Sequence, residues 1–216
     1  MRLLLIRHGE TPWTKEKRYQ GSTDISLTPK GIRQAKKIAR ELQNHPPVRL
    51  YTSTLRRAKE TAREIESHLK LQAVIDPRLN EINFGEWEGL NFSRLSKKEP
   101  VQFRRWCKGK LRKPPGGESI DSLSRRVGKF LNEILKRHEN ETVAVVSHGG
   151  PIKMFLFHAL KKEVDGFMPP ATLWSFRVDP GSISLVEGDS SLLQIAWTNR
   201  TVHLLSSRKK EKAFLP

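Results

Sequence analysis

Short apolar runs alternate with amphipathic helical segments along most of this chain, and the alternation limits the folds that it can adopt. Apolar runs typical of buried strands cover residues 3–6, 48–53, 72–79 and 142–150. Segments with helical spacing of their apolar residues cover 27–43, 54–69, 118–138 and 151–160. Parallel strands need such crossover helices between them. The sequence therefore predicts an α/β fold, a doubly wound and largely parallel sheet with helices on both faces.

Three more apolar runs close the chain, at residues 173–179, 182–188 and 191–198. Short turns separate them, so they predict late antiparallel strands added to the sheet. The loop-rich segment 82–116, which several prolines interrupt, is expected to form a small lid. No linker or repeat divides the sequence, and we expect residues 1–216 to form a single domain.

The composition indicates a cytoplasmic protein that attracts anions. Cys107 is the single cysteine, which excludes an intramolecular disulfide and fits a reducing compartment. We expect neither a secretory signal nor a membrane partner, because no segment has the required apolar length. Forty Lys and Arg residues against 23 Asp and Glu residues give a net charge of +17. The excess is largest in residues 94–117 and in the basic tail 206–216, and such a field favours anionic partners.

Chemically active side chains follow the carboxyl ends of the four predicted parallel strands. Arg7 and His8 follow the first strand, and His148 ends the fourth. Arg57 lies in the first turn of the helix after the second strand, and Glu81 follows the third. The carboxyl ends of parallel strands meet at one edge of the sheet, where ligands of such folds bind. We therefore expect these five side chains to surround one crevice.

Helical geometry separates Arg57 from its neighbour Arg56. At about 100° per residue, Arg57 falls at the border of the apolar face of its helix, whereas Arg56 points almost opposite. We expect Arg57 to reach the crevice and Arg56 to be solvated. An arginine-rich crevice suits phosphate, whose oxygens match the guanidinium fork, better than a metal ion, which the arginines would repel. We therefore expect no metal site and no cofactor.

Six motifs occur in order along residues 2–160: LIRHGETPW, RYQGSTDISLTPKGIRQA, YTSTLRRAKETA, LNEINFGEWEGL, GGES and VVSHGG. Together they resemble the successive motifs of the histidine phosphatase superfamily, also called the phosphoglycerate mutase-like family. The short lid segment and the later runs FRRW, PPGGES and LWSF resemble those of its small-molecule phosphatases, including phosphoserine phosphatases and α-ribazole phosphatases. The resemblance implies a small phosphorylated metabolite as the substrate.

The resemblance also implies a role for each of the five crevice residues. His8 corresponds to the nucleophile, which would attack phosphorus and form a phosphohistidine. Arg7 and Arg57 would bind the nonbridging oxygens, and a protonated His148 would add a further donor. Glu81 would protonate the leaving oxygen and then deprotonate water, which requires a raised pKa. These cations make a metal unnecessary for the implied chemistry.

Further substrate contacts are expected from six residues of the same motifs and of the lid: Thr14, Gln20, Gly21, Gly149, Arg104 and Trp106. Thr14 departs from the family, in which asparagine is usual at this position. Its hydroxyl donates one hydrogen bond with a shorter reach than an amide. We therefore expect a modest loss of phosphate affinity rather than a loss of activity.

Two other functions stay open. A cofactor-dependent phosphoglycerate mutase would share the core motifs, but the mutases carry a longer insertion after the acidic glutamate, and the short segment here favours hydrolysis. A basic nucleic-acid-binding module without catalysis would explain the charge, and its binding would weaken steeply with salt. The basic stretch has few interleaved aromatic residues, so nucleic acid is not expected as a partner. The sequence leaves open whether the chain forms a homodimer.

Overall fold

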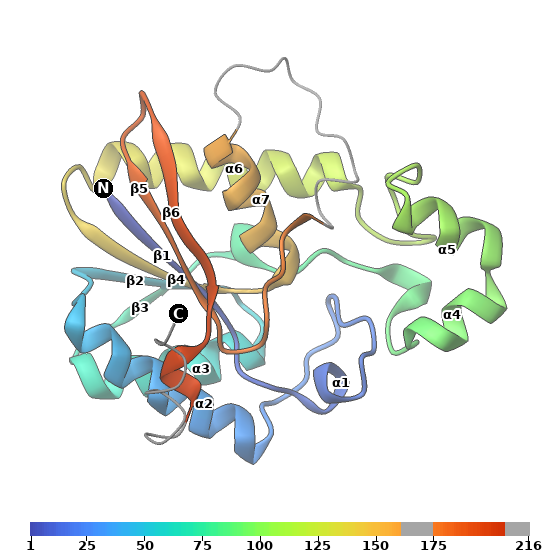
Figure 1. Cartoon of the computed structure of the whole chain (residues 1–216), viewed down its shortest axis with the longest axis horizontal. Helices are drawn as coiled ribbons and strands as arrows, with labels where there is room; N and C mark the ends of the chain where they lie inside the picture. The colour runs from blue at the N-terminus through green and yellow to red at the C-terminus, as the bar shows by residue number, and fades with distance from the viewer. Residues whose placement is uncertain (161–174, 206–216) are drawn as a thin grey trace, which may run out of the picture.

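A six-stranded mixed sheet forms the centre of the protein, in a computed structural model that describes residues 1–160 and 175–205. Its strands are β1 (Arg2–Arg7), β2 (Arg49–Thr52), β3 (Ala73–Ile75), β4 (Thr142–Ser147), β5 (Ile183–Gly188) and β6 (Leu193–Arg200). They follow the order β3-β2-β4-β1-β5-β6 (Figure 1). The first four of these are parallel, whereas β5 is antiparallel to β1 and β6 to β5. The predicted fold class is confirmed.

Helices connect the strands, and side chains cap the first turn of several of them. The α-helices are α1 (Pro12–Lys15), α2 (Pro29–Glu41), α3 (Arg56–Leu69), α4 (Phe92–Lys98), α5 (Pro100–Cys107), α6 (Ile120–Arg137) and α7 (Gly149–Leu160). Short 3₁₀ turns are η1 (Leu42–Asn44), η2 (Pro77–Leu79), η3 (Gly85–Trp87) and η4 (Val202–Leu204). Thr28 caps α2 by accepting from the Gly31 N–H, and Ser119 caps α6 by accepting from the Ser122 N–H. None of the described helices is long and apolar enough to cross a bilayer.

Alternate residues of β1 enter two hydrophobic cores, one on each face of the sheet. Leu3 and Leu5 pack into the core beneath α6 and α7, whereas Leu4 and Ile6 pack into the core beneath α2 and α3. In Figure 1, α6 and α7 lie above the strands and α2 and α3 below them. Successive strand residues point to opposite faces, so a strand covered on both faces needs an unbroken apolar run. This is why the sequence LLLI precedes the first polar residues of the site.

The pairing of β1 with β4 brings two strand ends side by side. In this parallel register Arg7 lies opposite Ser147, and the chain then continues into His8 and His148. The ladder extends one residue further, because the His8 N–H donates to the Ser147 carbonyl (3.0 Å). Both strands are central in the sheet. The register therefore places two histidines next to each other in a covered position.

One of the predicted late strands does not form. β5 and β6 pair as predicted from residues 182–188 and 191–198, but residues 175–179 are not in a strand, and 173–174 lie outside the described residues. The backbone of this stretch bonds to side chains instead. The Val178 carbonyl accepts from Arg7 Nη1 (2.6 Å), and the Asp179 N–H donates to Asn199 Oδ1 (2.6 Å). The apolar residue Val178 is buried as its type indicates, but it lies in a loop rather than in a strand.

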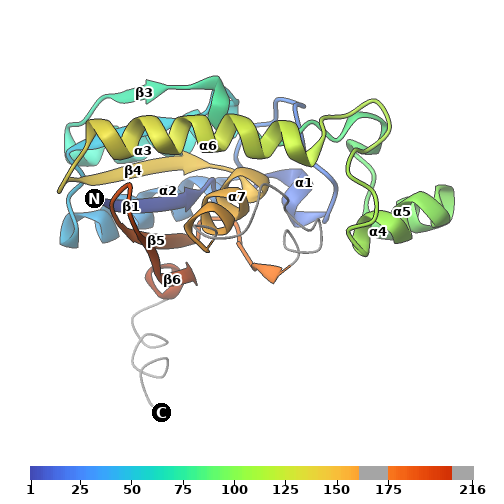
Figure 2. The same ribbon diagram turned by 90° about the horizontal axis from the view of Figure 1, so that it is seen from above.

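Residues 82–116 extend to one side of the sheet as η3, α4 and α5 (Figures 1 and 2). An aromatic cluster holds this segment together. The Trp87 ring packs edge-to-face against Phe103 and Trp106, with centroid distances of 6.4 and 5.6 Å. The predicted lid is thus a folded segment, while its closure over a ligand stays a prediction. The predicted basic tail, 206–216, lies outside the described residues.

Phe130 in α6 provides a test of the core beneath α6 and α7. Its fully buried ring packs edge-to-face against Tyr51 (5.3 Å) and Phe155 (5.9 Å). We expect Phe130→Ala to lower the free energy of unfolding by about 3–5 kcal/mol, because the lost ring leaves a cavity. Phe92 is 54% exposed on α4, and Phe92→Ala should cost about 1 kcal/mol or less. Denaturant unfolding measures both, and equal losses would contradict this packing.

Candidate active site

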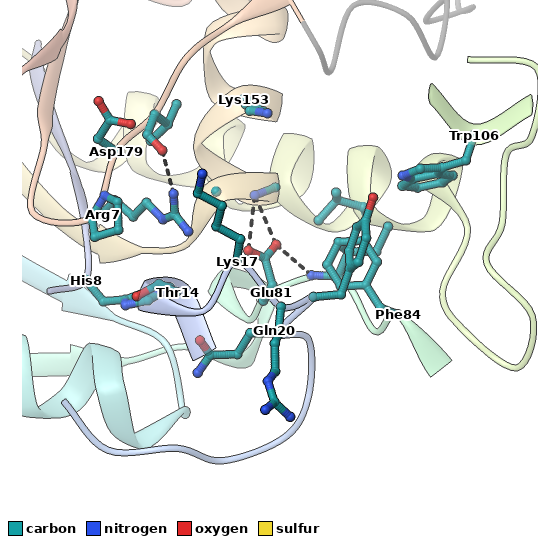
Figure 3. Close-up of a pocket in the computed structure, with 18 residues that line it drawn as sticks. Arg7, His8, Thr14, Lys17, Gln20, Glu81, Phe84, Trp106, Lys153 and Asp179 are labelled. Carbon is teal, nitrogen blue, oxygen red and sulfur yellow. Dashed lines mark hydrogen bonds between the residues drawn. The ribbon is translucent and has the colours of Figure 1, made fainter. Parts of the chain in front are cut away.

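A cavity of about 400 Å³ opens beyond the carboxyl ends of β1 and β4 (Figure 3). Arg7, His8 and Glu81 line it, together with Gly149 at the start of α7. The other two predicted residues stand beside His8: the His8 and His148 rings are 5.0 Å apart, and Arg57 bonds to His148. The structure therefore brings all five predicted side chains together. Among the described residues, no group of His, Cys, Asp or Glu side chains is arranged to hold a metal ion.

The His8 ring is held in one tautomer. Its Nδ1 lies 2.8 Å from the Gly9 carbonyl, and the side chain is 2% exposed. A carbonyl can only accept, so Nδ1 carries the proton and Nε2 keeps a lone pair. Burial lowers the pKa of His8 well below its ordinary value, and the charges of Arg57 and Arg7 lower it further. His8 is therefore a neutral imidazole with an unprotonated nitrogen at neutral pH.

His148 is also neutral in this structure, which corrects the sequence-based expectation of a protonated ring. Its Nδ1 accepts a hydrogen bond from Arg57 Nε (3.1 Å), and its Nε2 bonds to Ser53 Oγ (2.7 Å). A nitrogen that accepts from an arginine carries no proton. Complete burial lowers the pKa of His148 well below its ordinary value, and the charges of Arg57 and Arg7 lower it further. The sequence contained no sign of this contact, because Arg57 and His148 are 91 residues apart.

The distinction between Arg57 and Arg56 follows the helical geometry. Arg57 is fully buried, and its guanidinium donates to the carbonyls of Gly21 (2.8 Å) and Thr23 (2.9 Å) as well as to His148. Burial lowers the pKa of Arg57 to about 10, so it remains a cation at neutral pH. The side chain of Arg56 is 62% exposed and pairs with Glu60 on the outside of α3. Arg57, and not Arg56, therefore places a positive charge beside His148.

Arg7 enters the cavity from the end of β1. Its Nη1 donates to the Val178 carbonyl (2.6 Å), which fixes the guanidinium plane. Its buried Nε has no hydrogen-bond partner among the described residues. Burial lowers the pKa of Arg7, while the nearby carboxyl groups of Glu81 and Asp179 raise it. A buried N–H donor without an acceptor costs free energy, so this atom is suited to bind an anion in the cavity.

Glu81 lines the same cavity. Its Oε1 accepts from the N–H groups of Ile82 (2.9 Å) and Gly150 (3.0 Å). A Cβ atom at residue 150 would lie 2.4 Å from Oε1, so only glycine lets the carboxyl group approach the start of α7. Burial raises the pKa of Glu81, although both N–H groups and the charges of Arg57 and Arg7 oppose the shift. The carboxyl group is therefore poised to give up and regain a proton.

Thr14 and Gln20 contribute differently from the expectation for substrate contacts. The Thr14 hydroxyl caps its own helix: it donates to the Thr11 carbonyl (3.0 Å) and accepts from the Thr11 N–H (2.8 Å). The Thr11 hydroxyl in turn donates to Gln20 Oε1 (2.7 Å). Gln20 Nε2 is buried without a hydrogen-bond partner in the described part of the chain. Both residues line the cavity, but the available donor is Gln20 Nε2.

The remaining predicted contacts divide into two groups. Gly149 and Trp106 line the cavity. Arg104 does not, because the buried face of α5 carries Phe103 and Trp106 and leaves Arg104 exposed, so this prediction is wrong. Gly21 lies behind the site, where its carbonyl accepts from Arg57. Its contribution is therefore to hold an arginine rather than to line the cavity.

Sequence reasoning missed two lysines of the cavity. Lys17 adopts a left-handed backbone conformation (φ 54°) at the end of α1, and Figure 3 shows its side chain extending toward the Arg7 side of the cavity. Lys153 lines the cavity from α7, and burial followed by the charge of Arg7 lowers its pKa. Lys153 could have been found, because it lies four residues after Gly149 on the same helical face. Lys17 could not have been found in this way, because it lies beyond the end of α1 and belongs to no helical face.

Comparisons with known proteins agree with this geometry. A family model described as "Histidine phosphatase superfamily (branch 1)" matches residues 3–201. The chain is 36% identical to phosphoserine phosphatase 1 of Hydrogenobacter thermophilus, covering 94% of both chains. It is 34% identical to the adenosylcobalamin/alpha-ribazole phosphatase of Salmonella typhimurium, covering 89% of this chain and 94% of the relative.

Solved structures are similar along almost the whole chain. Bacillus stearothermophilus YhfR superposes with a TM-score of 0.84 at 32% identity, covering 94% of this chain and 99% of YhfR. Phosphoserine phosphatase from Entamoeba histolytica, solved in complex with 3-phosphoglyceric acid, superposes with a TM-score of 0.83 at 32% identity and the same coverage. The fold is therefore shared with these two solved structures along almost the whole chain.

The raised pKa of Glu81 predicts the pH dependence of stability in Glu81→Gln. A carboxyl group whose folded pKa is raised contributes fully below its unfolded pKa, and that contribution is lost as the pH rises through the folded pKa. We therefore expect the variant to be more stable than the wild type at pH 8. The gain should be about 1.4 kcal/mol for each pH unit by which the pKa of Glu81 in the folded protein exceeds that in the unfolded chain. The gain should vanish below about pH 4.

Thermal unfolding across pH measures this difference, with Glu139→Gln on the exposed surface as the matched control. The glutamine oxygen can still accept from both N–H groups, so hydrogen bonding is retained. A pH-independent difference, or destabilisation at pH 8, would contradict the raised pKa of Glu81.

Proposed function

The chain belongs to the histidine phosphatase superfamily, and on that basis we propose that it hydrolyses a small phosphorylated metabolite through a phosphohistidine on His8, without a metal ion. The observation that carries the proposal is the bond between His8 Nδ1 and the Gly9 carbonyl. That bond leaves Nε2 as the nucleophilic atom, and the lowered pKa keeps it unprotonated at neutral pH.

The first step transfers the phosphoryl group to the enzyme. His8 Nε2 forms a bond to phosphorus while the bond between phosphorus and the ester oxygen breaks. The leaving oxygen takes the proton of Glu81, whose raised pKa favours the protonated form. Arg7 and Arg57 stabilise the negative charge on the three other oxygens, and the unpaired N–H of Arg7 supplies a donor within the cavity.

The second step releases inorganic phosphate. The Glu81 carboxylate takes a proton from water, the water oxygen bonds to phosphorus, and the bond from phosphorus to Nε2 breaks. A bound phosphate dianion would also oppose the cationic repulsion that lowers the pKa of His148. Substrate binding would therefore raise that pKa and allow His148 to become the donor expected from the family resemblance.

The charge of the cavity supports a substrate with a second anionic group. Lys17 and Lys153 line the cavity in addition to the cations beside His8. One phosphate is matched by the arginines, and the positive charge of Lys17 suits a carboxylate as the second group. We therefore favour a phosphoserine-like substrate. An α-ribazole phosphate-like substrate is the second candidate, because Tyr19, Phe84 and Trp106 give the cavity an aromatic wall.

Three further points belong to the same proposal. We infer hydrolysis rather than mutase chemistry from the short segment between Glu81 and α6. We infer a cytoplasmic location from the single cysteine. We infer that the basic surface attracts anionic metabolites rather than nucleic acid as a specific partner.

His8→Ala tests the nucleophile. The variant should lose acid-labile phosphate labelling and lower turnover by at least about 10³-fold, because no other ring nitrogen can form the phosphoenzyme. His68→Ala, at an exposed position on α3, is the matched control and should retain both. Rapid quenching with labelled substrate in the presence of chelator measures the phosphoenzyme. Labelling that persists in His8→Ala, or wild-type turnover that chelator abolishes, would refute the proposal.

Lys17→Gln tests the second anionic group. We expect kcat/KM for phosphoserine to fall about 10-fold while that for propyl phosphate stays within about 2-fold, because only phosphoserine has a carboxylate for the lysine. Lys15→Gln, two residues earlier at the end of α1 and outside the cavity, should change neither. Steady-state kinetics with both esters measures this, and an equal loss for the two would mean that Lys17 serves the phosphate or the fold.

A further inference from the structure

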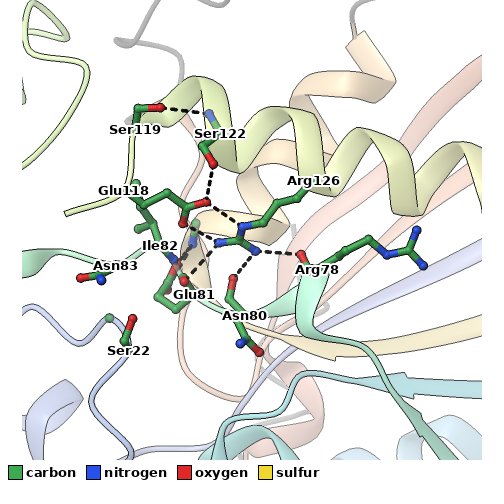
Figure 4. Close-up of polar contacts among 12 residues, drawn as sticks. Ser22, Arg78, Asn80, Glu81, Ile82, Asn83, Glu118, Ser119, Ser122 and Arg126 are labelled. Atoms are coloured by element: carbon green, nitrogen blue, oxygen red, sulfur yellow. Dashed lines mark hydrogen bonds and ion pairs between the residues drawn. The ribbon is translucent and has the colours of Figure 1, made fainter.

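We propose that Arg126, a residue of α6 outside the cavity, is a positioning residue for Glu81. Its guanidinium donates to three carbonyls of the segment that carries Glu81: Nη1 to Arg78 (2.7 Å) and Asn80 (2.6 Å), and Nη2 to Glu81 itself (3.1 Å). Figure 4 shows these bonds converging on one side chain. The inference rests on the proposed role of Glu81 as the acid and base of the reaction.

Glu118 completes the set of acceptors around Arg126. Arg126 Nε donates to Glu118 Oε1, and Nη2 donates to Glu118 Oε2, both at 2.8 Å. An arginine side chain has five N–H donors, and these two bonds with the three carbonyl bonds account for all five. Ser122 Oγ holds Glu118 in turn by donating to Oε1 (3.1 Å). Both charged side chains are mostly buried, with 19% and 17% exposure.

The three carbonyls need such a donor because their segment has no strand neighbour. The Arg78 carbonyl belongs to the short turn η2, and residues 80–82 that follow lie in no helix or strand. Buried carbonyls without partners cost free energy, and a single guanidinium satisfies three of them at once. The bond to the Glu81 carbonyl fixes the peptide plane next to the Glu81 side chain. That plane sets the direction in which the carboxyl group reaches the Gly150 N–H and the cavity.

Loss of the hydrogen bonds from Arg126 to the three carbonyls should affect proton transfer by Glu81 more than folding or substrate binding. A catalytic group displaced by about 1 Å can cost about 100-fold in rate. An acid is needed when the leaving group is a poor one, such as the alkoxide of serine, but hardly at all for p-nitrophenolate, which departs without a proton. A merely structural role would lower the activity toward both esters together. The dependence on the leaving group therefore separates positioning from general destabilisation.

The experiment measures kcat/KM for phosphoserine and for p-nitrophenyl phosphate, since this constant covers the steps up to departure of the leaving group. We expect Arg126→Met to lower kcat/KM about 10- to 100-fold for phosphoserine and less than about 3-fold for p-nitrophenyl phosphate. Arg126→Lys keeps the charge without the five-donor fork, and it should show the same selectivity with a smaller loss. It also keeps the test decisive where the methionine variant does not fold.

Two reference variants complete the design. Arg112→Met removes another arginine–carboxylate pair, with Asp121 at the start of the same helix, and should leave both substrates unaffected. Glu81→Gln should show the strongest dependence on the leaving group. If it does and the Arg126 variants lower both activities equally or not at all, the positioning role is overturned. If Glu81→Gln itself lacks the dependence, the role of Glu81 as the acid fails first, and the Arg126 proposal falls with it.

Discussion

The parallel register of β1 with β4 is the constraint on which the site depends. It sets Arg7 opposite Ser147 and lets the His8 N–H bond to the Ser147 carbonyl, so that the His8 and His148 rings come within 5.0 Å. A slip of one residue would move Leu3 and Leu5 into the core beneath α2 and α3, and Leu4 and Ile6 into the core beneath α6 and α7, although each core is packed around the other pair. The two hydrophobic cores therefore enforce the geometry of the nucleophile. The stability of the sheet and the placement of the reacting nitrogen are consequences of one pairing.

Burial then determines the charge of each group in the site. Burial lowers the pKa values of both Arg7 and Arg57, but nearby carboxyl groups, Glu81 first among them, oppose the shift, and both arginines remain cationic. Burial and those cations lower the pKa values of both histidines, whereas burial raises that of Glu81. The opposite shifts give the site a neutral nucleophile beside a carboxyl group that holds its proton to a higher pH than usual. Arg126 lies outside the cavity and donates hydrogen bonds to the carbonyls of Arg78, Asn80 and Glu81.

Sequence reasoning identified the features that follow from periodicity. The strand ends, the helical segments and the choice of Arg57 over Arg56 all follow from spacing along one element. Sequence reasoning was wrong where contacts between residues far apart in the chain determine the local structure or the protonation state. Residues 175–179 form a loop whose Val178 carbonyl accepts from Arg7, and His148 is neutral because Arg57 donates to it. Arg104 was misplaced because the buried face of a short helix in the lid depends on what packs against it.

The protonation state of His8 is the most direct test of the account, because the proposed chemistry requires a lone pair on Nε2 and a proton on Nδ1. Nitrogen-15 NMR of the imidazole rings across pH measures both. The account predicts a neutral His8 with its proton on Nδ1 at pH 7, and a pKa well below the ordinary value of 6.5. A doubly protonated His8 ring at pH 7, or a neutral ring with the proton on Nε2, would contradict it.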